Sequence, residues 1–557
     1  MITPSISVQN YKSLSDISGF NFLSEVDPLS QTLNSNRSER LGLNLNNNIL
    51  FRHRFKKQGR TFSVNLSTRY NDQDGETYSD AYSLYYKGPV NLSDTVRQFN
   101  DQLTKGTTWS SNISYTEPIG KKGAILEFRY NGSFTFNNSD KETYFMDDVS
   151  GKYSEFDTSL SNVFDNTYFT HRGGVNYRIG DREKQISFGV DLQEATLKSK
   201  QKFPYTASVT RSFTNLLPNA MVRLQISKKE NLRIFYRGGT REPSVNQLQD
   251  VIDNTNPIFV STGNPDLKQS YNHRIGGMYR WTNSAKSKSF SVNLFGTTTS
   301  NYVTTATYIA GKDSVLTPSV TLYRGSQLSK PINLNGQWNL TTYMYYSMPL
   351  KFIKTNMTLN GSVNYQKNPG MINNVSGITK TLNYSSGIIF ASNVSQYVDF
   401  TLSYNANFNT AKSTLQPELA NDYFMSRGSF ALNLLSKSGW LLNTDISNQS
   451  YSGLTDGYNQ SYWLWNMAVA KKILKGQKGE IRLAVFDLLD QNQSITRNVS
   501  ETYLEDVITQ VVKQYFMLTF TYNLRNFGKV PSRGNFNNNN FMRGGGGNFR
   551  GDFNRGD

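Results

Sequence analysis

The sequence predicts an all-β protein, a transmembrane antiparallel β-barrel of about 20–22 strands with short periplasmic turns and long extracellular loops. Three observations predict it. Apolar and polar residues alternate over many stretches of about eight to fourteen residues, which is the period of a strand. Short connections take turns with long polar ones along the chain. No apolar run approaches the ~20 residues that a membrane helix needs.

The strands can be followed in order from their alternation. In "RTFSVNLSTRY", Phe62, Val64, Leu66 and Tyr70 share one side, and serine, asparagine and arginine occupy the other. The stretch "GAILEFRYNGSFTF" repeats this pattern with leucine, phenylalanine and tyrosine on one side. The same alternation recurs in "QISFGVDL", "TNMTLNGSVNYQ", "YVDFTLSYNANF" and "EIRLAVFDLL". One side of each strand is therefore expected to face lipid and the other a wet lumen.

The connections predict which rim is which. Short turns are expected at 56–59, 117–123, 227–231, 283–288, 436–439 and 475–479. Long irregular stretches are expected at 137–166 and 238–267. Outer-membrane barrels place short turns in the periplasm and long loops outside the cell, so the long stretches are assigned to the outside.

Two other β architectures fit less well. Strands of a soluble β-sandwich usually run about five or six residues, whereas these are often ten or more, close to the ~9–11 that cross a membrane. A sandwich also lacks a regular asymmetry between turns and loops. A β-solenoid would show a repeat of fixed period, which the sequence lacks.

Composition excludes several kinds of site. The 557 residues include no cysteine, so a disulfide framework, a cysteine-based zinc cluster and a cysteine nucleophile are excluded. The three histidines, His53, His171 and His273, lie far apart in the sequence and lack metal-ligand spacing. No cofactor and no metal are expected.

The net charge of +17 does not predict nucleic-acid binding. Basic residues fall in short connections such as "FKKQG", "GKKG", "SKKEN" and "KGQKG" rather than in one stripe. Charge of this kind is typical of solvated turns or of contact with an anionic lipid surface. Outer-membrane lipid and lipopolysaccharide are therefore expected partners, and nucleic acid is not.

The last strand shows the alternation most clearly. In "YFMLTFTYNL" the lipid face is expected to hold Phe516, Leu518, Phe520, Tyr522 and Leu524. About nineteen strands can be counted from a first one at 41–55, and a single-chain bacterial barrel has an even number. At least one more strand is therefore expected before Leu41, with "SISVQNYKSLSDISGFNFL" as a weak candidate. The alternative is that the count is off by one or two in the stretch 71–107, where the alternation is poorest.

Several motifs occur in a fixed order along the chain. "SYTEPIGKKGAILEFRY" is followed by "RLQISKKENLRIFYRGGTREPSVNQLQD", by "GNPDLKQSYNHRIGGMYRW", by "IRLAVFDLLDQNQSITRN" and by the aromatic last strand. Over roughly residues 109–527 the chain resembles the barrel of TonB-dependent receptors, in the Bacteroidota branch often called the outer membrane β-barrel family. The resemblance implies that the loop between "REPSVNQLQ" and "GNPDLK" folds over the barrel mouth.

Two groups of residues are candidate contacts for a ligand or a partner. Arg241, Asn246 and Gln247 lie in the loop over the mouth, although the loop's Pro and Gly residues need only shape its path. Aromatic residues of the other long stretch, beside Asp147 and Asp148, suit ligand capture or protein contact. They are Tyr144, Phe145, Tyr153 and Phe156.

No catalytic residues are expected. The sequence holds no HExxH, GxSxG or GxxxxGK[ST] motif. The acid pairs Asp147 with Asp148 and Asp487 with Asp490 lie at a loop and at a strand end, where acids are usually solvated. The chain is therefore expected not to be an enzyme.

Three parts are expected along the chain. Residues 1–40 form a poorly patterned segment, either the first strand or strands or the end of a missing plug, and 41–527 form the barrel. Residues 528–557, rich in Asn, Gly and Arg and containing "RGD" twice, form a disordered periplasmic tail. The start shows no signal peptide, and the family's plug does not fit within forty residues. We expect the barrel part of a longer receptor-like protein, or a plugless relative.

Two functions follow from the resemblance and the loops. The first is uptake of a nutrient (a siderophore, a glycan or a peptide) through a plugged barrel that TonB energises. The second is a docking platform for lipoproteins or other outer-membrane proteins in a complex. An enzyme carried on the loops is a third and weaker alternative. The multi-pass barrel is expected in the outer membrane of a Gram-negative bacterium.

Overall fold

The computed structural model describes residues 1–522 with short gaps. The gaps are 25–26, 87–90, 121–122, 182, 393–394, 396, 416, 418–420, 455–458, 475–477, 500–503 and 510. Leu524, the lysine pair of the "GKKG" turn and the tail 528–557 with both "RGD" triplets lie outside the described residues.

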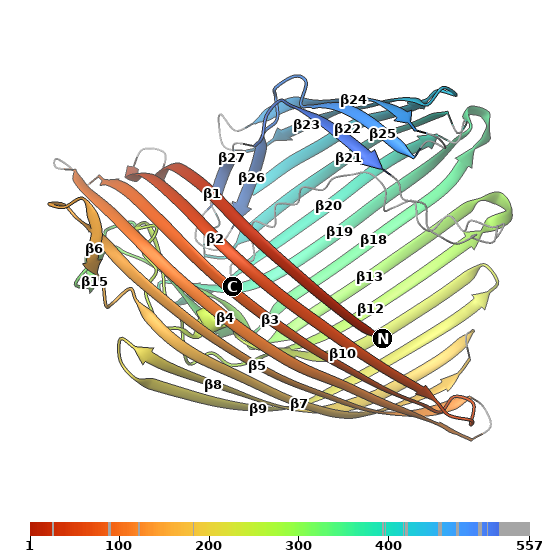
Figure 1. Ribbon diagram of the computed structural model, residues 1–557, viewed down its shortest axis with the longest axis horizontal. Coiled ribbons are helices and arrows are strands. Elements are labelled where there is room, and N and C mark those ends of the chain that lie inside the picture. Colours follow the sequence, from red (N-terminus) through yellow and green to blue (C-terminus); the bar gives the residue numbers. More distant parts are fainter. Residues whose placement is uncertain are drawn as a thin grey trace.

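The described residues form one large antiparallel sheet that curls round a lumen (Figure 1). Four of its 24 strands, β6, β11, β14 and β17, are short strands of the loop regions, and the other twenty follow one another with each strand antiparallel to the next. The predicted fold class is confirmed. The twenty strands are β1 (Ile2–Ser24), β2 (Asp27–Arg54), β3 (Thr61–Tyr85), β4 (Leu92–Ile119), β5 (Ala124–Asp147), β7 (Asn162–Gly180), β8 (Lys184–Phe203), β9 (Ala207–Ser227), β10 (Glu230–Arg241), β12 (Ser270–Asn283), β13 (Lys288–Ser300), β18 (Gln337–Leu350), β19 (Thr355–Ile372), β20 (Val375–Ser392), β21 (Val398–Ser413), β22 (Asn421–Leu435), β23 (Trp440–Ser452), β24 (Gln460–Ile473), β25 (Gly479–Phe486) and β28 (Tyr515–Tyr522).

The remaining elements are short and lie in the connections. Within the described residues, no helix is long and apolar enough to cross a membrane. The short elements are β6 (Lys152–Phe156), α1 (Val245–Leu248), β11 (Phe259–Ser261), η1 (Ser284–Lys286), β14 (Tyr302–Ile309), β15 (Ser314–Thr317), β16 (Val320–Leu322), β17 (Gln327–Leu334), η2 (Lys351–Ile353), β26 (Ser494–Val499) and β27 (Leu504–Thr509).

The two faces of the sheet differ as the alternation predicts. On the outer face the large apolar side chains of the last strand are exposed, including Phe516, Leu518 and Phe520. On the inner face small polar side chains bond across neighbouring strands, as where the Ser67 and Ser110 hydroxyls lie 2.6 Å apart. Apolar side chains exposed on a barrel wall are solvated by lipid acyl chains, and polar ones by water in the lumen.

The N-terminal residues join the same sheet. β1 pairs with β2 from Ile2 opposite Ile49 to Ser24 opposite Asp27. β1 therefore precedes Leu41, and the strand expected at 41–55 is β2, which begins earlier, at Asp27. Within the described residues, β1 and β28 each pair on one side and so form the two edges of the sheet.

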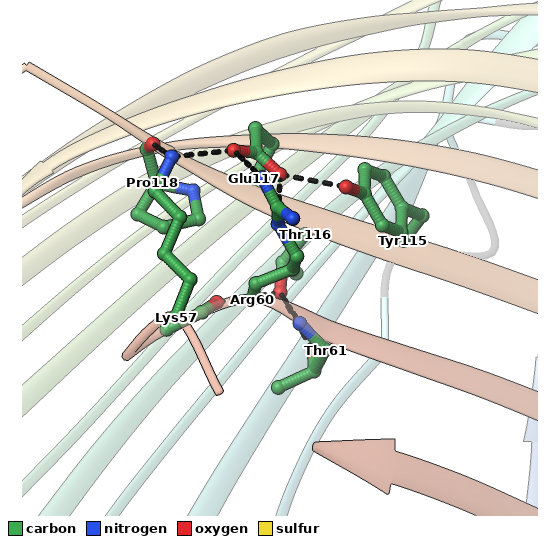
Figure 2. A network of polar contacts seen from close by, with 8 residues as sticks. Lys57, Arg60, Thr61, Tyr115, Thr116, Glu117 and Pro118 are labelled. Atoms are coloured by element: carbon green, nitrogen blue, oxygen red, sulfur yellow. Dashed lines mark hydrogen bonds and ion pairs between the residues drawn. The ribbon is translucent and has the colours of Figure 1, made fainter. Parts of the chain in front are cut away.

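A polar network fixes the turn between β2 and β3 to the end of β4 (Figure 2). Glu117 accepts hydrogen bonds from the Lys57 ammonium at 2.6 Å, the Arg60 Nε at 2.7 Å and the Tyr115 hydroxyl at 2.6 Å. Lys57 also reaches the carbonyl of Pro118 at 2.8 Å. The Arg60 hydrogen bond, followed by those from Lys57 and Tyr115, lowers the pKa of Glu117 far below its ordinary value. The motif "YTEP" is therefore a clamp at the short-turn rim.

The opposite rim differs from the sequence-based expectation. The stretch 137–166 was expected to be one irregular loop, yet β5 continues to Asp147, β6 follows and β7 begins at Asn162. The polar residues of this stretch stay in a sheet because β4 and β7 pair with β5 far beyond the lipid-facing part. A strand that projects into water needs paired backbone groups but no apolar side chains, so hydropathy alone places its end too early.

Candidate functional site

The loop between β10 and β12, residues 242–269, reaches from β8 to β2 at the loop-side end of the barrel and so forms a cover there, with the Thr255 carbonyl accepting from the Asn34 amide of β2 at 3.1 Å. It contains α1 and β11, and β11 runs parallel to β17 of the neighbouring loop. The side-chain amide of Asn264 donates to the carbonyl of Pro331 at 2.8 Å, and the backbone N–H of Thr262 donates to the carbonyl of Ser329 at 3.0 Å. These bonds hold the motif "GNPDLK" against β17, as expected for a loop with a fixed path.

Glu242 anchors the start of this cover to the barrel wall. It accepts a hydrogen bond from the Tyr168 hydroxyl of β7 and another from the side-chain amide of Gln269 at 3.0 Å. Gln269 in turn accepts from the Asn215 amide of β9 at 2.6 Å. Both ends of the loop therefore meet at one carboxylate. Glu242 was not among the residues singled out from the sequence, because a lone acid beside a proline carries no signal by itself.

The three predicted loop residues do not form one site. Gln247 works inside the loop: its side chain accepts from the Ser244 backbone N–H at 2.9 Å and its carbonyl accepts from the Asn264 N–H at 2.6 Å. Asn246 is exposed on α1, and Arg241 is exposed at the end of β10. Their role as ligand contacts stays a prediction, and Gln247 has a structural task as well.

The second loop, residues 301–336, packs against the first through apolar side chains. Val260 of the cover is buried with Ala310 and Leu322, and Leu316 and Leu328 pack on them. Leu248 and Leu267 of the cover are buried with Leu197 of β8. The cover therefore has an apolar core of its own, which fixes it on the wall.

A hairpin of β26 and β27 lies in the connection between β25 and β28 and is fixed by a buried ion pair. The Arg497 Nε lies 2.6 Å from the Asp506 carboxylate, and both side chains are almost fully buried. Arg497 also donates to the carbonyl of Gly453 at 2.8 Å and lies over the ring of Tyr423. Breaking one partner of such a pair leaves a buried charge, so the hairpin is held firmly.

Three of the four predicted aromatic residues, Tyr144, Tyr153 and Phe156, come together on the outer face, far above the short-turn rim. We call them and their aromatic neighbours the outer aromatic group. The ring centroids of Phe99 and Tyr144 are 6.3 Å apart, those of Tyr144 and Phe156 are 5.3 Å apart, and Tyr153 lies 5.6 Å from Tyr78. The group consists of Tyr78, Phe99, Tyr144, Tyr153, Phe156 and Phe203. Phe145 follows Tyr144 in the strand and so points to the other face.

Acidic residues form a row beside this group. Glu76 of β3 lies opposite Asp101 of β4, and Asp101 lies opposite Glu142 of β5. Desolvation by the neighbouring strands, followed by the charges of Asp74 and Glu142, raises the pKa of Asp101. Like charges directly opposite one another destabilise a sheet, so the row has a cost that pairing with a neighbour of opposite charge would relieve.

The inner wall carries an ion network at membrane depth. Asp191 of β8 accepts from the Nη2 of Arg129 in β5 at 2.9 Å and from the Nε of Arg172 in β7 at 2.9 Å. β7 lies between β5 and β8, and a side chain at Gly174 would block the bridge, because an added Cβ would lie 1.7 Å from the Asp191 Oδ1. The glycine therefore opens the gap through which Asp191 reaches Arg129.

The described residues offer no group of three or more histidine, aspartate or glutamate side chains placed to hold a metal ion. His171 and His273 each bond through Nδ1 to a tyrosine hydroxyl, at 2.6 Å from Tyr130 and 2.8 Å from Tyr236. Asp487 caps the turn after β25 by accepting from the backbone N–H groups of Gln491 and Asn492, which accounts for its place in "DLLD".

Several solved structures are similar to this chain. They include the ferric citrate transporter FecA in its unliganded form, with 10% identity over 93% of this chain and 78% of that one and a TM-score of 0.42. The siderophore receptor PiuA from Acinetobacter baumannii has 8% identity over 94% and 77%, with a TM-score of 0.43. The Serratia marcescens hemophore receptor HasR, solved with its hemophore HasA and heme, has 11% identity over 93% and 76%, with a TM-score of 0.42. At these values the structures say nothing about the solute of this chain.

Among curated proteins the comparison finds no match. The model of one family does match, over residues 53–522, from the end of β2 to the end of β28. With the sheet, its exposed apolar outer face and its polar inner face, this identifies the chain as a member of the outer membrane protein beta-barrel family.

Proposed function

We propose that the chain forms the barrel of a receptor-like protein that takes up a nutrient across the outer membrane, with a siderophore, a glycan or a peptide as the class of solute. The observation that carries the proposal is the cover of residues 242–269, anchored through Glu242 and fixed by its own apolar core. A fixed cover above a polar lumen favours a receptor that recognises its solute at the mouth over an open pore.

The proposal includes a plug and TonB, which the motif resemblance to TonB-dependent receptors of the Bacteroidota type supports. In it, residues 1–40 supply the first strands of the barrel, residues 41–527 the rest of it and 528–557 a periplasmic tail. It includes no catalytic step. Arg241 and Asn246, both exposed at the cover, are its candidate solute contacts.

The second candidate function is a docking platform in a complex with lipoproteins or other outer-membrane proteins. The outer aromatic group favours it, because Tyr144, Tyr153 and Phe156 gather on a wall outside the membrane, with Phe156 42% exposed. Aromatic side chains are enriched at the centres of protein interfaces.

Purification from the native membrane distinguishes the two functions. For uptake we expect the full-length protein to carry a small solute that mass spectrometry identifies, without a stoichiometric partner. A stoichiometric partner protein that is lost when Phe156 is replaced by serine would overturn uptake in favour of docking. Asn246→Ser, at an exposed position on the cover, is the matched control for that loss.

A further inference from the structure

A polar cavity lies against the inner wall of the barrel at membrane depth. Its volume is about 410 Å³, and, apart from Gly132, every residue of its lining has a polar side chain. Arg129, Asp191 and Arg237 each lie five to seven residues from the short-turn end of their strands, which places them within the ~9–11 residues that cross the lipid. The residues that matter here are Asn112, Arg129, Arg172, Asp191, Gln193 and Arg237.

The cavity carries more positive than negative charge. Asp191 is its single acid, and both of its carboxylate oxygens are taken, Oδ1 by Arg129 and Oδ2 by Arg172. The Nε of Arg129 is buried and makes no hydrogen bond. Within the described residues, the side chain of Arg237 makes neither an ion pair nor a hydrogen bond. The guanidinium groups of Arg129 and Arg237 thus have N–H donors that make no hydrogen bond.

The positive charge continues along the same wall. Arg237 of β10 lies directly opposite Arg274 of β12, and Arg233 of β10 lies directly opposite Arg223 of β9. There are two arginines in β9, three in β10 and two in β12, and the one acid of these strands is Glu230 at the short-turn rim. Like charges opposite one another cost stability, so an anion bound between them is favoured.

We propose that this part of the lumen wall is a binding site for a solute that carries carboxylate or phosphate groups. Arg237 makes the main contact, and Arg129 and Arg172 add positive charge beside it. A guanidinium presents paired donors whose geometry matches carboxylate and phosphate oxygens. The narrow, low-dielectric surroundings of a barrel wall strengthen the attraction relative to open water.

The site names a solute class for the proposed function and so rests on it. An uptake receptor whose inner wall holds anions would pass anionic solutes in preference to neutral ones. Besides Gly132, the rest of the lining consists of serine, threonine, asparagine and glutamine, whose side chains can donate hydrogen bonds to the same oxygens.

The test measures binding of citrate and of inorganic pyrophosphate to the purified full chain in neutral detergent by isothermal titration calorimetry. We expect both probes to bind, and Arg237→Gln to weaken binding about 10- to 100-fold, the value of a lost charged hydrogen bond. Arg237→Lys should recover part of the affinity. Raising the salt concentration should weaken binding of both probes.

Arg69→Gln is the matched control. Arg69 is an arginine of β3 on the same inner face, away from the cavity, where its Nε bonds to Asn46 at 3.0 Å. The same loss of charge there should leave the affinity unchanged. The inference is overturned by absence of binding of either probe, or by equal loss in the two variants once circular dichroism shows both folded. A copurified partner protein would overturn the proposed uptake function, whereas the anion-binding inference is decided by the calorimetry alone.

Discussion

At the scale of single residues, neighbouring positions of a strand face opposite environments. Leu402 of β21 is 48% exposed on the outer face, while the hydroxyl of its neighbour Ser403 lies 2.7 Å from that of Ser429 on the inner face. Of these two adjacent side chains, that of Leu402 thus faces lipid and that of Ser403 faces water. A change of one position reverses the environment of a side chain.

The lipid face can be tested at this pair. We expect Leu402→Arg to lower the free energy of unfolding by about 2–4 kcal/mol, because the charge then faces the middle of the bilayer. Ser403→Arg should be tolerated in the wet lumen. Urea unfolding in lipid vesicles measures both variants, and equal losses would show that the register or the environment is wrong.

Some residue-scale contacts could be predicted from the sequence and others could not. Alternation alone assigned Phe516, Leu518 and Phe520 to the exposed outer face, because a strand's period is fixed by backbone geometry. The bridge from Asp191 to Arg129 spans three strands and depends on the missing side chain of Gly174. Such a contact is absent from local sequence, since it depends on the register between strands.

At the scale of elements, the loop-side ends of β3, β4 and β5 combine continuous backbone pairing, which stabilises them, with a row of like charges, which destabilises them. Pairing of their backbones continues from Thr61 opposite Thr116 to Tyr85 opposite Leu92, and the strands stay regular without an apolar core. Across them runs the acidic row. On the same face of the sheet, next to this row, Asp72 lies opposite Lys105, and their opposite charges attract.

The acidic row predicts a pH dependence. The pKa of Asp101 is raised in the folded state, so the folded chain holds more protons than the unfolded one above about pH 4, and stability falls as pH rises through the folded pKa. Asp101→Asn should slow hydrogen exchange of the β4 and β5 amides at pH 7. The free energy of local opening should rise by the lower end of the range of about 0.2–1 kcal/mol that one cross-strand pair contributes. The gain should vanish below about pH 4.

The control for this prediction is Asp72→Asn on the same strand face. It removes a carboxylate that faces Lys105 and accepts a hydrogen bond from the Tyr70 hydroxyl at 3.0 Å. Exchange at pH 7 should become faster in this variant. If both substitutions change exchange in the same direction, the charge of the row does not govern these ends.

The loop elements show where sequence reasoning ends. The turn and proline signals at Gly263 and Pro265 indicated a loop with a fixed path, and the motif resemblance implied that it folds over the mouth. Its partners, Glu242 with Tyr168 and the parallel pairing of β11 with β17, could not be predicted. They join segments far apart in the chain, whose approach depends on the whole barrel.

At the scale of the whole molecule, orientation follows from the rims. The turn at Lys228–Lys229 joins β9 and β10 directly, whereas Lys152 and Lys312 lie exposed in connections at the other rim. Trypsin added to intact cells should cleave after Lys152 or Lys312 and leave Lys228–Lys229 intact until the outer membrane is permeabilised. Mass spectrometry of the fragments measures this.

The opposite pattern, with cleavage at Lys228–Lys229 in intact cells, would reverse the topology. The cover itself is a poor site for the protease, because Val260 is 1% exposed and its neighbours are bonded to β17. Protection there is expected in either orientation.

The unequal lengths of the strands have a consequence for how a molecule reaches the protein. β4 has 28 residues and β24 has 14, so at ~3.3 Å per residue and a tilt of about 40° the wall is roughly 35 Å taller on one side. The opening is thus slanted (Figure 1). A molecule that approaches along the cell surface from the tall side meets the wall that carries the outer aromatic group, whereas one that approaches from the opposite side meets a much lower wall. The direction of approach decides which residues make the first encounter.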